Sequence, residues 1–227
     1  METIAKMRLN FLAAAAVSAA LYAAPITIYN TGVDSANTLL TNPAVDSHWS
    51  LAAGPSGAGT LSVIPNLGPI FSYWAGNGPS AQWVTPTGNA LDFLPPGDYT
   101  FRTTFDLTGF DATTGSFTGT FFADNTVSDI RINGVSLGIS GGDFKNPTNF
   151  VINCGVICTA GANTLDFVVT NTTTSASPVG LRVDIAGTAD AAAPPPPTGV
   201  PEPSTIAMLA TGCALFGFAR VGKRKLQ

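Results

Sequence analysis

The stretch YTFRTTFDL, from Tyr99 to Leu107, alternates apolar and polar side chains along its whole length. Its odd-numbered residues can face a core while its even-numbered residues face water, because successive side chains of a strand point to opposite faces. The same period of two returns in VGLRVDI, from Val179 to Ile185. Both stretches are therefore predicted to be half-buried β-strands.

A tight hairpin is predicted in IRINGVSL, from Ile130 to Leu137. Both flanks of its Asn133-Gly134 pair alternate, and Asn-Gly accepts the two positive φ angles of a type I′ turn. Other strands are expected between turns rich in Gly, Pro, Ser and Asn. They lie near residues 26–29, 48–51, 61–64, 71–74, 81–85, 117–123 and 165–169.

The composition also favours a turn-rich β protein. The 227 residues include 24 Gly and 17 Pro, which cost roughly 1 and 3 kcal/mol each inside a helix. The segment 25–190 shows no convincing helical periodicity and is long enough for one core. The predicted fold is all-β, a single antiparallel β-sandwich of the jelly-roll type.

Charge is scarce and unevenly placed. Only 11% of the residues are charged, whereas about 25% is usual in soluble domains. Between residues 25 and 190, four Lys and Arg stand against twelve Asp and no Glu, a net charge of 4 − 12 = −8. Affinity for nucleic acid depends on neutralising phosphates with Lys and Arg. Nucleic acid is therefore excluded as a partner.

Residues 1–24 have the layout of a secretory signal peptide. Lys6 and Arg8 precede an apolar run over 11–21, and small residues follow it. An N-terminal membrane anchor is the alternative, but this run would span only about 16 Å of a hydrocarbon layer about 30 Å thick. Cleavage is expected between Ala20 and Ala24, and its position within that range stays open.

The other end of the chain has three parts beyond an Ala/Pro-rich linker, residues 191–199, which is expected to be stiff and extended. A short motif precedes an apolar run over 206–219, predicted to be a transmembrane helix, and a basic cluster follows as a stop on the cytoplasmic side. The motif comprises Val200, Pro201, Glu202, Pro203, Ser204 and Thr205, and the stop comprises Arg220, Lys223, Arg224 and Lys225.

This end, residues 200–227, resembles the PEP-CTERM sorting signal of Gram-negative bacteria that make extracellular polysaccharide. The resemblance implies recognition by a membrane-embedded exosortase and processing near Pro201-Glu202-Pro203. It also implies transient contact with the inner membrane and delivery to the cell envelope, cell surface or extracellular matrix. The motif residues would then be an enzyme's substrate. An ordinary C-terminal anchor is the alternative.

The middle of the chain carries FADN at 122–125, the hairpin at 130–137 and AGANTLDF at 160–167. In these features it resembles galactose-binding-like sandwiches and related carbohydrate-binding modules, over roughly residues 99–187. The resemblance implies an architecture more than a sugar site, because one fold hosts many functions.

The few cysteine and histidine residues limit the kinds of catalytic and metal site that this chain can form. His48 is the only histidine, which removes most sites built on a His base or several His ligands. Cys154 and Cys158 flank a short predicted loop, and an exported context permits a disulfide between them. A zinc site is the rival, although the domain has no further Cys to complete it. Cys213 lies in the apolar run, as a small filler or a lipid-attachment candidate.

Three aromatic residues, Tyr73, Trp74 and Trp83, form a candidate sugar platform if they are exposed. An aromatic face stacks against the C–H face of a sugar ring. The preferred interpretation is that the tryptophans belong to the core of the sandwich.

Three other residues, Asp124, Asn125 and Asp129, precede the hairpin and are candidates for a structural Ca²⁺ site. Calcium takes six to eight oxygen ligands, which loops can supply. The preferred interpretation is that they are turn residues in contact with solvent, because Asp side chains bond nearby backbone in turns.

The sequence singles out no catalytic residues. A glycoside hydrolase needs a matched pair of carboxylates, and the twelve Asp show no distinguishing spacing. The Gly-x-Ser-x-Gly elbow of a serine hydrolase is also missing. The predicted function is non-enzymatic, as a structural, adhesive or exopolysaccharide-associated component of a biofilm matrix. A carbohydrate-binding module is the alternative, and a glycoside hydrolase ranks third.

Overall fold

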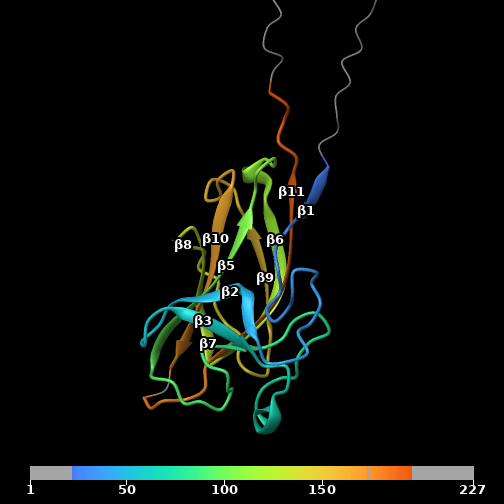
Figure 1. Ribbon diagram of the computed structural model, residues 1–227. Coiled ribbons are helices and arrows are strands. Elements are labelled where there is room, and N and C mark those ends of the chain that lie inside the picture. The colour runs from blue at the N-terminus through green and yellow to red at the C-terminus, as the bar shows by residue number, and fades with distance from the viewer. Residues whose placement is uncertain (1–21, 173, 196–227) are drawn as a thin grey trace, which may run out of the picture. The chain divides into compact units, whose positions relative to one another are not determined.

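The computed structural model describes residues 22–172 and 174–195 (Figure 1). Within them the chain forms eleven strands and two short 3-10 helices. One compact unit ends at Ala192, and a second unit comprises 193–227. The strands are β1 (Ala23–Ile26), β2 (Val45–Ala53), β3 (Gly59–Val63), β4 (Val84–Thr85), β5 (Gly97–Asp106), β6 (Ser116–Asp124), β7 (Thr126–Ile132), β8 (Val135–Ser136), β9 (Thr148–Asn153), β10 (Ala162–Asn171) and β11 (Gly180–Asp190), and the helices are η1 (Gly68–Ser72) and η2 (Ala112–Thr114).

All strand pairs are antiparallel and belong to one continuous ladder. Its order is β8-β7-β10-β5-β2-β3-β4-β11-β6-β9, and β1 pairs with β11 beside this path. The ladder folds back on itself, because Phe167 on β10 contacts Phe121 on β6 and Phe150 on β9, with ring centroids 5.6 and 5.7 Å apart. The all-β antiparallel prediction is confirmed. Its two stacked layers are sandwich-like, but β3 and β4 join them into one sheet.

The alternating stretch from Tyr99 to Leu107 forms most of β5 and is buried as its pattern predicts. On β5, Tyr99, Phe101 and Phe105 are buried, and the residues between them are partly or fully exposed except Thr103. Its neighbour β10 is buried along most of its length, from Leu165 to Val169 without a break, so it does not show the same alternation.

The predicted hairpin is present as β7 and β8. Asn133 and Gly134 have φ angles of 51° and 80°, and Ile132 pairs with Val135 across the turn. The Asn133 side chain also fixes the turn to its surroundings. Its Nδ2 donates to the carbonyl of Ile157 at 2.9 Å, and its Oδ1 accepts from the backbone N–H of Thr164 at 3.0 Å.

Some predicted strands are wrong or misplaced. The strand expected at 71–74 is absent, because Pro69 begins helix η1 and the chain turns there. The strand expected at 81–85 is only Val84–Thr85, and the one expected at 26–29 is shifted to Ala23–Ile26. Strand β9 was not predicted at all.

Strands β1 and β11 bring the two ends of the folded unit together, since Ala23 pairs with Asp190 and Ile26 with Gly187. Two residues that the sequence assigns to the signal peptide, Ala23 and Ala24, thus lie in a strand. The remainder of the predicted signal peptide, the sorting motif and the apolar run over 206–219 lie outside the described residues. Among the described residues, no helix has the length and apolar character needed to cross a membrane.

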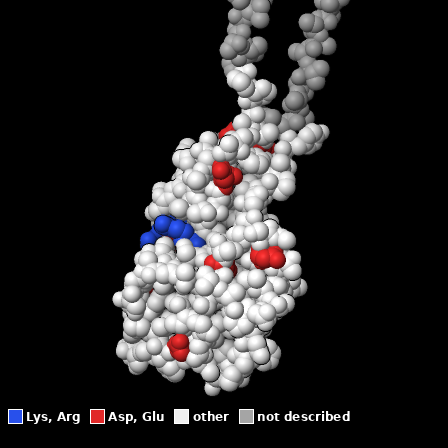
Figure 2. Space-filling model, viewed as in Figure 1, with Lys and Arg blue, Asp and Glu red and all other residues white. Residues whose placement is uncertain are grey.

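Charged side chains are sparse on the face of the domain shown in Figure 2. Two of the basic residues are paired with carboxylates. Arg102 binds Asp166 through Nε and Nη2 at 2.6 and 2.7 Å, and Arg131 binds Asp129 at 2.7 Å. Asp166 is almost fully buried, so its bidentate partner compensates a charge that would otherwise be costly.

Candidate functional site

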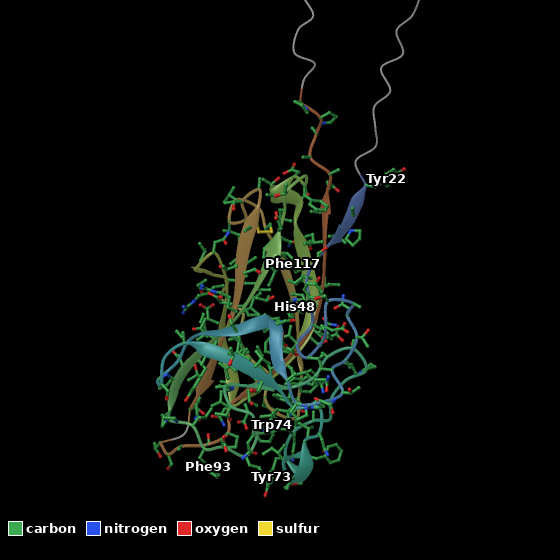
Figure 3. All side chains as sticks on the ribbon, in the orientation of Figure 1. Tyr22, His48, Tyr73, Trp74, Phe93 and Phe117 are labelled. Carbon is green, nitrogen blue, oxygen red and sulfur yellow. A yellow bond between two sulfur atoms is a disulfide. The ribbon has the colours of Figure 1, made fainter. Side chains whose placement is uncertain are left out.

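A pocket of about 350 Å³ opens at one end of the folded unit. It lies at the opposite end from Tyr22 and β1, as the labels of Tyr73, Trp74 and Phe93 show in Figure 3. Separate loops form its walls: the η1 segment, the turn before β5, the end of β6, and the segment before β11. Its residues are therefore brought together by the fold from positions that are far apart in the sequence.

The rim of the pocket is aromatic and exposed. Tyr73 is 61% exposed, Phe93 is 71% exposed and Leu91 is 40% exposed. The backbone beneath them is fixed: the N–H of Tyr73 donates to the carbonyl of Ile70, and that of Leu91 donates to the Asn89 side chain. Exposed apolar side chains gathered at a concave site commonly mark a binding surface.

The tryptophans lie beneath this rim. Trp74 and Trp83 are 2% and 0% exposed, with ring centroids 4.3 Å apart. The indole N–H of Trp83 donates to the carbonyl of Ala75 at 2.8 Å. Trp74 approaches the chain closely at Gly180, where an added Cβ would lie 2.5 Å from its ring. Trp74 and Trp83 therefore belong to the interior, as the preferred interpretation of the sequence held, and of the three platform candidates only Tyr73 is on the surface.

The floor of the pocket contains a buried carboxylate, Asp124. Its Oδ2 accepts from Trp74 Nε1 at 2.7 Å, and its Oδ1 accepts from Asn125 Nδ2 at 2.9 Å. Burial raises the pKa of Asp124 to about 6, and the bond from Trp74 only partly offsets this effect. Asn125 is held in turn by the backbone N–H of Thr172, which donates to its Oδ1 at 3.0 Å.

The calcium candidates do not converge on one point. Asp129 is engaged in its own hairpin, where it accepts from Arg131 Nε and Ser136 Oγ at 2.7 and 2.8 Å. Asp124 lies in the pocket floor, where its two oxygens accept from Trp74 and Asn125. It is buried, so the interpretation of this residue as a turn residue in contact with solvent is wrong. In the described ranges no group of three or more His, Cys, Asp or Glu side chains is placed to hold a metal. These residues do not fit a calcium site, and none is proposed there.

Cys154, Cys158 and His48 are not among the residues that line the pocket. A disulfide joins Cys154 to Cys158, the pairing expected from the sequence, and both residues are buried. Gly115 leaves room for it, because an added Cβ would lie 2.7 Å from Cys154 Sγ. His48 stacks on Tyr29 with ring centroids 3.6 Å apart. This stacked histidine is a partly buried packing residue.

The sequence could not have identified the pocket as a whole. Tyr73 was a candidate because of its type, but Phe93 and Leu91 were not singled out. The available signal was the run LDFLPPG from Leu91 to Gly97, in which apolar residues stand directly before a Pro-Pro turn. Apolar side chains in such a turn have little chance of entering a sheet core.

Comparison with known proteins gives a firm result for the tail. Residues 199–225 match the PEP-CTERM protein-sorting motif, which confirms the resemblance seen in the sequence. The motif implies export, processing by an exosortase-type enzyme and membrane-associated sorting to the cell envelope or surface. The match covers a small part of the chain.

Comparisons that involve the folded unit are less informative. No curated protein matches the chain. Among solved structures, the CBM36-1 domain of a multidomain xylanase from the hindgut metagenome of Trinervitermes trinervoides is similar at 13% identity. The alignment covers 76% of this chain and 100% of that chain, with a TM-score of 0.32. A TM-score this low carries no argument about the site or its function.

Proposed function

We propose that this chain is an exported, exosortase-sorted protein of the Gram-negative cell surface or matrix that binds carbohydrate without catalysing a reaction. The sorting motif at 199–225 supports its destination. The aromatic-rimmed pocket carries the proposal of sugar binding. The proposal therefore joins the exopolysaccharide-associated role predicted from the sequence to its alternative, a carbohydrate-binding module.

The residues of the pocket suit the two sides of a sugar ring. The C–H face of a pyranose stacks on aromatic side chains, which Tyr73 and Phe93 supply at the rim. Its hydroxyl groups need polar partners, which Asp124 and Asn125 supply at the floor. The volume of about 350 Å³ lies at the small end of the usual range for ligand sites. We therefore expect one or two sugar units to occupy it.

The position of the pocket also suits a tethered protein. Strands β1 and β11 begin and end at one end of the folded unit, and the pocket is at the other end (Figure 3). The chain therefore leaves β11 at the end of the folded unit away from the pocket.

A binding role is favoured over hydrolysis by the carboxylates of the pocket. Glycosidases use two carboxyl groups, about 5–5.5 Å apart in retaining enzymes and 6.5–9.5 Å apart in inverting enzymes. Among the described residues that line the pocket, Asp124 is the only carboxylate. Its two oxygens accept bonds from Trp74 and Asn125, as expected of a fixed binding group.

Binding can be tested with the mature protein purified from the producing cells. On an array of bacterial and plant polysaccharides, we expect at least one glycan to bind. Substitution Tyr73→Ala or Phe93→Ala should weaken that binding roughly tenfold, the value of one aromatic stacking contact. Phe71→Ala is the matched control, because Phe71 is 65% exposed on the same loop but does not line this pocket.

Either of two results would contradict the binding proposal. One is the absence of binding to every glycan on the array. The other is an equal effect of the control and the rim variants. Sorting is tested separately by mass spectrometry of the mature chain, in which an intact terminus at Gln227 would contradict exosortase processing. The signal peptide over 1–24 and the membrane helix over 206–219 stay predictions from the sequence.

A further inference from the structure

The charge of the residues that line the pocket is negative. Its floor holds the buried carboxylate of Asp124, and no Lys or Arg is among the described residues that line it. Lys145 follows the lining residue Phe144, but its charge lies near Asp143. The pKa of Asp143 is lowered by the hydrogen bonds that its side chain accepts and, to a smaller extent, by the charge of Lys145. The guanidinium of Arg182 lies 4.0 Å from the ring centroid of Phe122 and interacts with Asp184.

The floor of the pocket also presents more hydrogen-bond acceptors than free donors. The single N–H of the Trp74 indole donates to Asp124, and so does the Asn125 amide. An ionised carboxylate accepts about four hydrogen bonds, so Asp124 retains capacity for two more. The floor therefore offers acceptors to a ligand, while the indole N–H of Trp74 and one of the two N–H groups of the Asn125 amide are already directed at Asp124.

We propose that the pocket selects an uncharged sugar and rejects its uronic acid counterpart. This inference rests on the carbohydrate-binding function proposed above and defines its substrate class. A sugar hydroxyl can donate a hydrogen bond to the Asp124 carboxylate in the floor. An ionised uronate carboxylate has no proton to donate and can only accept hydrogen bonds. A uronate in the pocket would also bring a second negative charge next to Asp124, in a domain whose residues 25–190 already carry a net charge of 4 − 12 = −8.

The size of the effect follows from Coulomb's law. A ligand carboxylate at roughly 6–8 Å from Asp124, with an effective dielectric constant of about 40, meets a repulsion that weakens binding roughly tenfold. Loss of hydration from the ligand carboxylate, with no cation in the pocket to replace the water, adds to this penalty. We therefore expect uronates to bind at least about ten times more weakly than the matched neutral sugars.

The test uses pairs of polymers that differ only in charge. Soluble neutral glucan, galactan and mannan are compared with the same three polymers oxidised at C6 to uronates, by calorimetry on the mature protein. Tighter binding of a neutral polymer, at least about tenfold over its oxidised form, supports the inference. Equal or tighter binding of the oxidised form overturns it and leaves the proposed function standing. Binding of none of the six, together with an empty glycan array, removes the proposed function itself.

Two sets of variants tie the selectivity to the pocket. Tyr73→Ala and Phe93→Ala should weaken binding of the neutral polymer, and unchanged binding would place the sugar elsewhere and overturn the inference. Asp124→Asn should reduce the preference for the neutral form severalfold, while Asp98→Asn should leave it unchanged. Asp98 is an exposed aspartate on β5 and is not among the residues that line the pocket. The comparison of polymers on the wild-type protein needs no variant, so it decides even if Asp124→Asn disturbs folding.

Discussion

The buried carboxylate of Asp124 should contribute less to the stability of the folded protein at neutral pH than in mild acid. Its pKa rises from 3.8 to about 6 on folding, because burial disfavours the charged form. The folded state therefore binds the proton more tightly than the unfolded state. The stability that this group contributes is present at low pH and is lost as the pH rises from about 4 to above 6.

The magnitude follows from the size of the shift. A change of about two pKa units corresponds to about 3 kcal/mol at most, at 1.36 kcal/mol per unit. Between pH 4 and pH 7 the loss is about 2–3 kcal/mol, since a small part of it has already occurred by pH 4. This is a large fraction of the stability of a typical domain.

The substitution Asp124→Asn isolates this contribution. The amide has one acceptor oxygen where the carboxylate has two, so the variant loses a bond from Trp74 or Asn125, a fixed cost of roughly 1–3 kcal/mol. That cost does not vary with pH. We therefore expect the stability of the variant relative to the wild type to rise by about 2–3 kcal/mol between pH 4 and pH 7.

The assay is urea unfolding of the mature protein followed by tryptophan fluorescence, at closely spaced pH values. The wild-type curve alone is not diagnostic, because burial also raises the pKa of Asp46, while hydrogen bonds lower the pKa of Asp106 and of Asp111. The difference between variant and wild type cancels these contributions. Asp98→Asn serves as the exposed control. A difference for Asp124→Asn that stays constant from pH 4 to pH 7 would refute the reasoning.

Three further predictions concern packing, the disulfide and processing. Gly119→Ala should destabilise the fold by about 3 kcal/mol or more, because the new Cβ would lie 2.1 Å from a backbone oxygen of β11. The same urea assay measures this change. Gly59→Ala is the control, because an added Cβ at Gly59 meets open space. Replacing Cys154 and Cys158 by Ala should cost about 2 kcal/mol, the closure entropy of so short a loop, and a cost above about 5 kcal/mol would contradict that account. The N-terminus of the mature protein, determined by mass spectrometry, should lie at or before Ala23, because β1 would then keep its pairing with β11. A terminus beyond Ile26 would show that β1 is dispensable.

Local signals explain which parts of the fold could be predicted. The alternation of β5 and the Asn133-Gly134 turn depend on residues adjacent in sequence, and both were found where the pattern placed them. Strand β9 was missed because Phe150, Val151 and Ile152 are consecutive apolar residues without visible alternation. Only the pairing with β6 at the edge of the sheet buries the first and third and exposes Val151.

Tertiary contacts explain the failures around the pocket. The residues from Phe71 to Trp74 resemble a short strand by composition, but Pro69 and the burial of Ile70 and Trp74 in a second apolar cluster produce a 3-10 turn instead. The pocket joins Tyr73, Phe93 and Asp124, which no spacing rule connects. The disulfide could be inferred because its two cysteines are close in the sequence and have few alternative partners.

The antiparallel pairing of β6 with β11 has a mechanical consequence. Its ladder runs from Gly180 to Thr188 on β11, and β11 continues to its pairing with β1, where the chain leaves the folded unit (Figure 1). If a matrix polymer pulls at the pocket while the cell holds the far end, tension acts along these strands and perpendicular to their hydrogen bonds. The hydrogen bonds then share the load in shear instead of breaking one after another. Shear is the stronger of these two ways to load a sheet.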